Sequence, residues 1–541
     1  MPGKFFSERW IRAGLPFLGL ALISAMLLAN GVFYTEFARE LFIPVEGVIH
    51  IGAGQWPHTG FHTPVGALYY VVHWLPTLVF PLSARTIIHA DMIAAVVAAA
   101  LVVWGARERL PAWAGALCAF YVGLVAMSPR QIGESLATIS NNASYNRWGW
   151  ALTCVVAMIV AIPPMSGDRR RTLIEGGVLG VVIALLFFTK LSYFGAGLGL
   201  LLVAGVTVRR AQAVPLLGSA LVVLVAIICL VQLTTGLVGA YLADIRFAAS
   251  AQPSLMRAPA AYRLAVAFAP GAIFAVVMPV LALGTPSRFT AYVPPVLMTA
   301  AIVAAGVGIA VQNHLELENP LLPIAMLTGW FSVRGMGPSG GPTPGRPGDL
   351  VASIAILGIF AIPLVQDTGA SVYAMVAPAS RGSEVAWLAK TPFRDLRIIP
   401  GQPGARFSEN RQVQNDEGFF GLFGDGARLL DRHLHGRRDV TVLPFLMTNP
   451  YPALLGTRPV PHELAWWDAQ RTFNAQRTPD PAMLDRVDYV LIPDASYGFS
   501  EATTMAEAYG AALRRSFRVI DRTPVWTLLA RTDCPGVSCR R

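Results

Sequence analysis

The chain is short of charge for its length. Only 14% of its 541 residues are Asp, Glu, Lys or Arg, 54% are hydrophobic, and the mean hydropathy is +0.53. Soluble proteins of ordinary composition carry about 25% charged residues. This shortage excludes an ordinary soluble enzyme and indicates a polytopic membrane protein.

Lysine is nearly absent. The chain has only Lys4, Lys190 and Lys390, so its net charge of +10 comes almost wholly from arginine. The arginines are scattered over the loops between apolar runs. Such a distribution indicates membrane topology and not nucleic-acid binding, so we expect no nucleic-acid partner.

Cysteine is also scarce, with five residues. Cys118, Cys154 and Cys229 lie inside apolar runs, where cysteine acts as a small hydrophobic side chain. Cys534 and Cys539 lie in CPGVSC near the C-terminus, which has neither the spacing of a CxxC redox site nor companions for a zinc site. We expect these two to form a short disulfide if that end faces an oxidising compartment.

Long apolar runs, in contrast, are abundant. They lie near residues 13–34, 87–104, 112–128, 148–163, 173–189, 192–208, 214–235, 263–284, 293–312, 320–333 and 350–366. These runs predict a mainly α, polytopic membrane protein of about 11 transmembrane helices. The first run could instead be a cleaved signal peptide, but no convincing A-x-A-like cleavage site follows it.

Positive residues orient these spans, because Arg and Lys concentrate in cytoplasmic loops. The basic segment 4–12 therefore places the N-terminus in the cytoplasm. The apolar run 65–82 is ambiguous. If it crossed the membrane, the arginine-containing loops would lie outside; if it lies flat on the outer surface or re-enters, they lie inside. These loops are 107–109, 167–172 and 209–210. The second arrangement satisfies the rule, and we adopt it.

With this topology, residues 35–85 form one long outer loop with an amphipathic surface helix. The other outer segments are 129–147, 189–192, 236–262 and 313–319, and the Gly/Pro-rich stretch 335–349 is a cytoplasmic linker. Residues 1–366 thus form the transmembrane domain. Residues 367–541 are too long for a loop and alternate helix-like with strand-like stretches, which predicts an extracytoplasmic α/β domain.

Ionisable and amide side chains gather at the predicted outer edge, although such groups are expensive at membrane depth. Singly, each has an ordinary explanation: Arg147 could be an interfacial anchor and Lys190 could snorkel. Together, they predict a site for an anionic, partly lipidic substrate. The candidates are Glu36, Glu46, His58, His62, Glu134, Asn142, Asn146, Arg147, Lys190, Tyr193 and Arg246.

The outer segments also resemble a known family. A long loop with a juxtamembrane acidic residue follows the first span, then GQWPHTGFHTPVGALYY (residues 54–70), and then NRWGW and FFTKLSY at successive outer membrane edges. This pattern looks like the GT-C superfamily of glycosyltransferases that use polyprenyl-phosphate sugars. Within that superfamily it is most similar to the bacterial lipid-A aminoarabinose and core galacturonosyltransferases. The resemblance covers about residues 10–260.

One position departs from the family pattern. Members usually carry an aspartate within P-[YH]-x-D-F-x-x-P-x-G, and this chain has Gly60 at that position. Either the base in this branch is Glu36, which matches the family's acidic residue near the start of the loop, or the protein has lost its activity. We favour Glu36.

The resemblance implies a reaction. A sugar on undecaprenyl phosphate or a similar lipid would be moved to a glycan or lipid acceptor of the cell envelope, on the periplasmic side of the bacterial inner membrane. The C-terminal domain would then be periplasmic, and the acceptor glycan is one ligand it could bind.

The resemblance also implies roles for the candidate residues. Glu36, with Glu46 as second choice, would take the proton of the acceptor hydroxyl. Lys190 and Arg147, with Arg246 behind them, would stabilise the phosphate leaving group. Asn142, Asn146 and Tyr193 would bind sugar hydroxyls. The other candidates would also contact substrate: His58, His62 and Glu134.

Four of the nine histidines lie between residues 50 and 73, which raises the question of a metal. His58 and His62 have i, i+4 spacing, but the prolines and glycine around them make a helix improbable, so the spacing does not put both on one face. We favour hydrogen bonding or proton shuttling over a divalent metal, and expect no cofactor.

Three other interpretations stay open. A transporter or flippase of lipid-linked sugars would also need polar groups and a lipid path, but the charges gather at the outer edge and no repeat relates two halves. A non-catalytic GT-C-like scaffold in polysaccharide assembly would explain Gly60. A polymerase or ligase of O-antigen type usually depends on a large late outer loop, whereas the large outer element here is a C-terminal domain.

Overall fold

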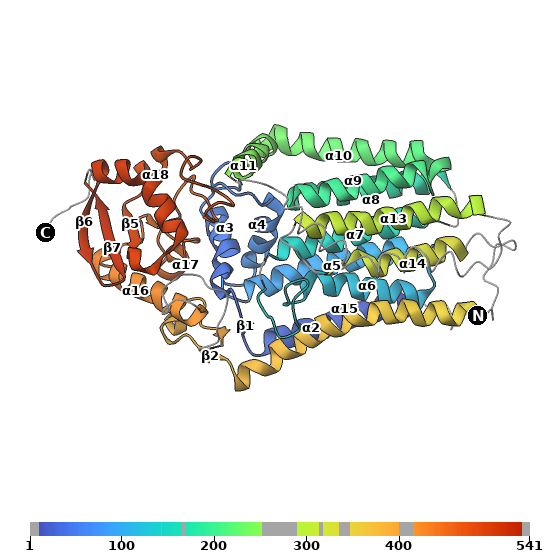
Figure 1. Ribbon diagram of the computed structural model, residues 1–541, viewed down its shortest axis with the longest axis horizontal. Coiled ribbons are helices and arrows are strands. Elements are labelled where there is room, and N and C mark those ends of the chain that lie inside the picture. The colour runs from blue at the N-terminus through green and yellow to red at the C-terminus, as the bar shows by residue number, and fades with distance from the viewer. Residues whose placement is uncertain are drawn as a thin grey trace.

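The computed structural model describes residues 10–141, 143–164, 168–251, 289–312, 318–334, 347–399 and 415–532. The molecule is elongated, with a bundle of long helices at one end and a smaller α/β domain of C-terminal residues at the other (Figure 1). The N-terminus lies at the end of the bundle far from that domain. The predicted fold class, a mainly α chain with a C-terminal α/β domain, is confirmed.

Ten long helices of the described residues form the bundle, preceded by the short π-helical turn η1 (Trp10–Gly14). They are α2 (Leu15–Ala29), α5 (Thr86–Ala106), α6 (Ala112–Met127), α7 (Ser144–Ala161), α8 (Arg169–Thr189), α9 (Leu191–Val206), α10 (Ala213–Thr235), α13 (Phe289–Gln312), α14 (Leu321–Arg334) and α15 (Pro347–Ser380). Each predicted span within the described residues has a matching helix, and the run near 263–284 lies outside them. α15 continues to Ser380, well beyond the predicted end near residue 366.

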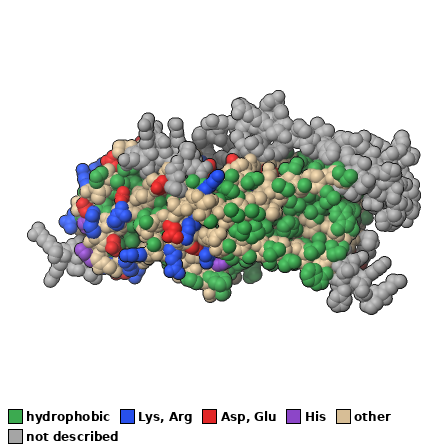
Figure 2. Space-filling model, turned by 90° about the horizontal axis from the view of Figure 1, so that it is seen from below, with side chains coloured by type: hydrophobic (Ala, Val, Ile, Leu, Met, Phe, Trp, Pro, Cys, Tyr) green, Lys and Arg blue, Asp and Glu red, His purple; other side chains and the backbone are tan. Residues whose placement is uncertain are grey.

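The bundle is built to face lipid. Within the described residues, five helical segments are long and apolar enough to cross a membrane, and shorter apolar helices occur beside them. Large apolar side chains point outward: Val214, Leu233 and Val365 are 84%, 85% and 66% exposed. On the face shown in Figure 2, hydrophobic side chains are abundant over the bundle, whereas charged ones gather toward the C-terminal domain. So large an apolar surface is costly in water and favourable in a bilayer, so the chain is a multi-pass membrane protein.

Helix α7 is the centre of the bundle. Its side chains from Arg147 to Ala161 are buried, and it packs against α5, α6, α8, α9 and α14. Gly149 permits the approach of α9, because a Cβ there would lie 2.5 Å from the Tyr193 ring. A helix that is apolar on all sides is typical of a position fully enclosed by other helices.

The segment between α2 and α5 forms no span. It contains β1 (Val32–Tyr34), η2 (Ala38–Leu41), α3 (Phe42–Gly52), α4 (Ala67–Trp74) and η3 (Leu75–Leu78). A helix needs about 20 residues to cross the hydrocarbon core, and α4 with η3 is far shorter. We call residues 35–85 the first loop; α3 and α4 lie between the bundle and the C-terminal domain in Figure 1.

The C-terminal domain is built on a four-stranded sheet in the order β4-β5-β7-β6. Its strands are β4 (Val442–Pro444), β5 (Tyr489–Pro493), β6 (Phe517–Arg522) and β7 (Trp526–Arg531); β4 and β5 are parallel and the other pairs antiparallel. The helices are α16 (Asp416–Leu434), α17 (Tyr451–Leu455) and α18 (Ser500–Ser516), with short 3₁₀ turns η8 (Pro481–Arg486) and η9 (Ala495–Tyr497). The alternation of helix-like and strand-like stretches expected for residues 367–541 is present in the part of this segment that the structure describes.

A small second sheet attaches this domain to the bundle. β3 (Leu396–Ile398) is the middle strand: β1 pairs with it in parallel on one side, and β2 (Ser383–Glu384) pairs with it antiparallel on the other. The 3₁₀ turn η6 (Ala386–Lys390) lies between β2 and β3 in the chain. Gly31, which precedes β1, has a φ of 82°, and a Cβ there would lie 2.3 Å from the Asp395 carbonyl oxygen. Only glycine therefore allows this close approach of the two chain segments.

The two ends of the bundle carry different loops. At the end near the N-terminus, Glu175 of α8 pairs with Arg109 (2.6 Å), Arg209 (2.8 Å) and Arg171 (3.1 Å). The loops 107–109, 167–172 and 209–210, which the sequence analysis placed on the same side of the membrane, thus meet around one carboxylate. We call this the arginine end, and the opposite end, which carries the first loop, the loop end.

Candidate functional site

The predicted site segments come together at the loop end. The Thr35 amide donates to the Ile139 carbonyl (2.8 Å), and the Ile139 amide donates back to the Thr35 hydroxyl (2.8 Å), which joins the first loop to the loop between α6 and α7. The Gly66 amide donates to the Thr189 carbonyl (3.1 Å), which joins the start of α4 to the end of α8. Three segments far apart in sequence therefore surround one region.

Glu36 lies in this region, directly after β1. Phe37 then takes a left-handed conformation (φ 59°) that turns the chain into η2. Partial burial raises the pKa of Glu36, and the nearby Glu134 carboxylate raises it further. Among the described residues, the Glu36 carboxylate has no hydrogen-bond or ion-pair partner. It is thus a partly accessible carboxylate of increased basicity.

Lys190 and Asn146 also meet at this end. Lys190 is the one extended residue between α8 and α9 (φ −169°, ψ 136°), so its side chain leaves the helix pair. Its Nζ donates to Asn146 Oδ1 (3.2 Å) and lies 5.4 Å from the centre of the Tyr145 ring. The Tyr145 ring in turn packs edge-on against Tyr69 of α4, with ring centres 5.2 Å apart. Two predicted substrate-binding residues are therefore neighbours, and α4 of the first loop packs against the Tyr145 ring beside them.

Tyr193 and Arg147 are both buried in the bundle. Tyr193 is fully buried and packs edge-on against Trp150. Arg147 is 4% exposed, donates to the carbonyl oxygens of Val125 (2.9 Å) and Arg130, and lies 3.7 Å from Asp367. A cation at the C-terminal end of α6 interacts favourably with the helix dipole. Because Arg147 binds carbonyl groups of both α6 and the loop after it, it holds that loop in place.

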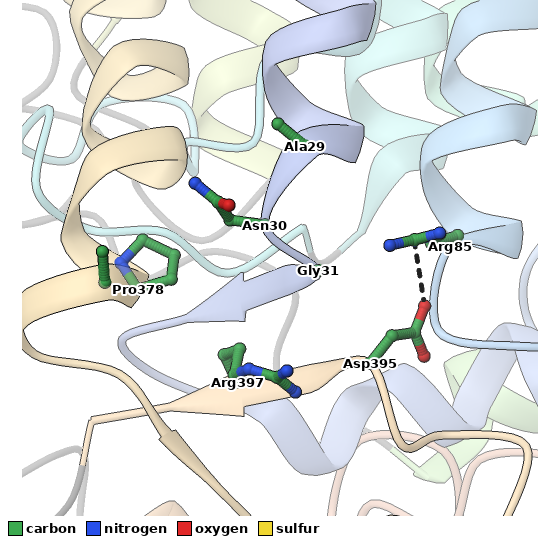
Figure 3. A pocket seen from close by; sticks show the side chains of 8 residues that line it. Ala29, Asn30, Gly31, Arg85, Pro378, Asp395 and Arg397 are labelled. Carbon is green, nitrogen blue, oxygen red and sulfur yellow. Dashed lines mark ion pairs between the residues drawn. The ribbon is translucent and has the colours of Figure 1, made fainter.

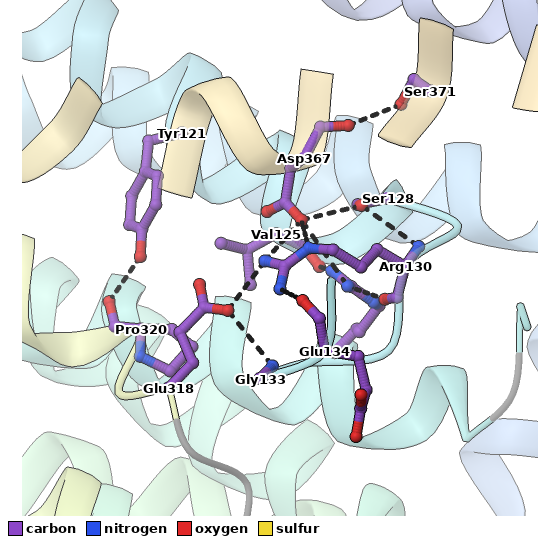
Figure 4. Close-up of polar contacts among 11 residues, drawn as sticks. Tyr121, Val125, Ser128, Arg130, Gly133, Glu134, Glu318, Pro320, Asp367 and Ser371 are labelled. Carbon is purple, nitrogen blue, oxygen red and sulfur yellow. Dashed lines mark hydrogen bonds and ion pairs between the residues drawn. The ribbon is translucent and has the colours of Figure 1, made fainter. Parts of the chain in front are cut away.

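An ion network that sequence analysis missed holds the same loop. Arg130 donates to Asp367 of α15 (3.0 Å) and to Glu318 (2.7 Å), and the Ser128 hydroxyl also donates to Asp367 (2.8 Å) (Figure 4). Arg130 further donates to the Glu134 carbonyl (2.8 Å), which fixes the backbone of the residue beside Glu36. The signal was present: Asp367 is a carboxylate inside an apolar helix, but the span was expected to end before it.

His58 and His62 share one carboxylate. Their Nδ1 atoms each lie 2.8 Å from an oxygen of Asp244, which belongs to α11 (Leu237–Ala251). The Thr63 amide also donates to Asp244 (3.1 Å). The hydrogen bond to Asp244 raises the pKa of His62 against the opposing effect of burial. The two histidines thus attach the first loop to α11, and only His62, whose side chain is 36% exposed, remains accessible.

The presence of glycine at residue 60 has a structural reason. A Cβ at this position would lie 2.7 Å from the Cα of Gln55, and the Gly60 carbonyl accepts a hydrogen bond from the His462 amide (2.7 Å). The loop therefore has no room for a side chain where the resembling family carries aspartate.

The other predicted residues are dispersed. Glu46 is buried in α3 against the C-terminal domain, where it accepts a hydrogen bond from the Asn449 amide (3.0 Å). Glu134 and Arg246 are exposed. Asn142, the predicted disulfide of Cys534 with Cys539, and most of the predicted linker 335–349 lie outside the described residues.

Two cavities lie apart from these residues. One, of 330 Å³, lies at the end of α2 beside the small sheet and is lined by Asn30, Arg397 and the ion pair of Arg85 with Asp395 (3.3 Å) (Figure 3). The other, of 630 Å³, lies between α8 and α10 at the arginine end. Neither cavity is lined by a predicted site residue.

No protein-family model and no curated protein matches the chain. Solved structures with a similar arrangement include ArnT from Cupriavidus metallidurans bound to undecaprenyl phosphate and the same protein in the apo state. They are 14% and 15% identical to this chain, with TM-scores of 0.46 and 0.48, and each match covers 95% of this chain and 97% of the other.

Proposed function

We propose that the protein is a membrane glycosyltransferase that moves a sugar from a polyprenyl-phosphate donor to a glycan or lipid acceptor at the loop end. The observation that carries the proposal is Glu36, a partly accessible carboxylate whose pKa is raised by burial and by Glu134. It lies on the same end of the bundle as the Lys190 and Asn146 pair. The motif resemblance of the outer segments points to the same chemistry.

The charge distribution supports an outward-facing site. Arg109, Arg171 and Arg209 gather at the arginine end, and positive residues concentrate on the cytoplasmic side of membrane proteins. The loop end would then face the periplasm of a bacterial inner membrane, where a flipped lipid-linked sugar is accessible. The C-terminal domain, which packs on the first loop, would be periplasmic as well.

The reaction would be one displacement at the anomeric carbon. Glu36 accepts the proton of the acceptor hydroxyl, whose oxygen forms a bond to the anomeric carbon. The bond between that carbon and the phosphate oxygen breaks, and polyprenyl phosphate leaves with the electron pair. A general base of this kind contributes about 10² to 10⁴ in rate.

Lys190 would stabilise the leaving phosphate. Its ammonium group is half-buried at the membrane edge, where a cation is worth more than in bulk water. The Tyr145 ring and Asn146 hold it in place. Arg147 and the Arg130 network would act indirectly by fixing the loop that carries Glu134, and His62 and Arg246 are exposed enough to contact the acceptor.

A gene deletion tests the proposal. We expect a cell without the chain to lack one sugar in a surface glycan or lipid and to accumulate the polyprenyl-phosphate donor, as measured by mass spectrometry. Complementation by wild type restores the glycan, and complementation by Glu36→Gln does not. Restoration by both would indicate a scaffold or transporter, or a base other than Glu36. Accumulation of donor on the inner leaflet alone would indicate a flippase.

A further inference from the structure

A second cluster of ionisable groups lies where α3 meets the C-terminal domain. His50 Nε2 is 3.2 Å from an oxygen of Glu463 and 3.9 Å from an oxygen of Glu46, one helical turn before it. All three side chains have no exposed surface. Burying two carboxylates is costly unless a positive charge accompanies them.

The hydrogen bond on the other side of the imidazole defines its tautomer. His50 Nδ1 lies 2.8 Å from Gln55 Oε1, an oxygen that can only accept, so Nδ1 carries the proton. In the neutral ring, the Nε2 lone pair then faces the carboxylates. Among the described residues, neither His50 Nε2 nor Glu46 Oε1 has a hydrogen-bond partner. With the ring neutral, three electron-rich atoms converge: His50 Nε2, Glu46 Oε1 and Glu463 Oε1.

Backbone amides orient both carboxylates of the cluster. Glu46 Oε2 accepts from the Asn449 amide (3.0 Å), and Glu463 Oε1 accepts from the Val460 amide (3.1 Å). The Phe61 ring stacks on the imidazole with ring centres 4.6 Å apart. Oriented ligands with hydrogen-bonded outer partners and a hydrophobic shell are typical of metal sites.

We propose that Glu46, His50 and Glu463 bind a divalent transition-metal cation, with Zn²⁺ as the best match, and that this cation clamps the C-terminal domain onto the first loop. One imidazole and two carboxylates suit zinc, whose ligand atoms lie roughly 3.4 Å apart around a tetrahedral ion. The cluster atoms lie within 4.8 Å of one another, so a small closure completes the site. Because the cluster is buried, the ion has a structural role, and the proposal does not rest on glycosyl transfer.

Metal content tests the proposal directly. The full chain, purified in detergent without chelators from zinc-supplemented cells, should hold about one zinc per chain by mass spectrometry of the elements. His50→Ala and Glu463→Gln should lose it. The matched control is His433→Ala, because His433 pairs with Asp521 (2.8 Å) elsewhere in the same domain; this variant should retain the metal.

Chelation of the wild type keeps the test valid if the variants fail to fold. A strong zinc chelator should lower the unfolding temperature by several degrees, and zinc but not magnesium should restore it. Hydrogen exchange should increase in α3 and around Glu463 and not at the arginine end. Wild-type chain without bound metal and with an unfolding temperature insensitive to chelator would overturn the proposal and indicate a protonated His50 between the two carboxylates.

Discussion

The two ends of the helical bundle surround their carboxylates with opposite charges. At the arginine end, Glu175 is fully buried and surrounded by Arg109, Arg171 and Arg209. At the loop end, Glu36 is partly accessible, lies near a second carboxylate, and has no ion-pair partner among the described residues. A carboxylate enclosed by cations is held ionised and can only hold the structure together. A carboxylate beside another carboxylate is a better proton acceptor.

The largest expected effect separates these two roles. Glu36→Gln should lower the rate of sugar transfer at least about 100-fold, because the amide cannot accept the proton. The unfolding temperature should stay unchanged, since the side chain makes no ion pair within the described structure. Transfer assays and thermal unfolding in detergent measure both quantities. The control is Glu507→Gln, at an exposed position of α18, which should leave both unchanged.

Glu175→Gln should show the reverse pattern. Removing one partner of a buried ion pair costs about 3–5 kcal/mol of stability, because the arginines are left without their counter-charge. Unfolding should therefore occur at much lower temperature or denaturant concentration, while the folded fraction transfers sugar at the normal rate. Arg107→Gln, which removes an ion pair that is largely exposed, should cost less than about 1 kcal/mol. If Glu175→Gln were as stable as the wild type, the arginine end would not have the structural role that we assign to it.

Lys190→Met should lower transfer about 100-fold, because it removes the cation that we propose stabilises the leaving phosphate, and it keeps the apolar stem. Lys390→Met is the matched control: Lys390 is exposed at the end of η6 and is the other lysine within the described residues. A Lys190 variant that retains the wild-type turnover number and Michaelis constant would exclude Lys190 from the phosphate site.

The smallest effect is on pH dependence. If Glu36 is the general base that we propose, it has to be deprotonated to accept a proton, so transfer should fall as the pH drops through its raised pKa. Burial is the main cause of that raised pKa and Glu134 the second; Asp416 of α16 is a further acidic group nearby. Glu134→Gln should therefore move the acid limb of the rate profile to lower pH and leave the plateau unchanged. A limb that stays in place would mean that another group controls it.

Much of this arrangement was predictable from the sequence. Apolar runs located the helices because each span must be continuous in lipid, and the scattered arginines correctly grouped residues 107–109, 167–172 and 209–210 at one end. The sequence placed Lys190 and Asn146 at the same outer edge because both lie at the ends of predicted spans, and the structure makes them neighbours.

The rest depended on contacts that sequence spacing does not encode. Asp244 binds both His58 and His62 across more than 180 positions, and Glu463 reaches His50 from another domain. Asp367 was missed because the last helix continues past its apolar run. Gly60 stands where the family that the sequence resembles has aspartate, and Gln55 leaves no room there for a side chain. Only the folded loop shows this contact.

The most direct test of the central claim is release of polyprenyl phosphate by the purified chain. Lipid extract from cells lacking the gene would serve as donor, with wild type and Glu36→Gln assayed side by side and the product measured by mass spectrometry. We predict one polyprenyl phosphate released for each sugar transferred by wild type, and release at least about 100-fold slower with the variant. Equal release by both would contradict Glu36 as the base, and no release by wild type from an extract that contains the accumulated donor would contradict a glycosyltransferase.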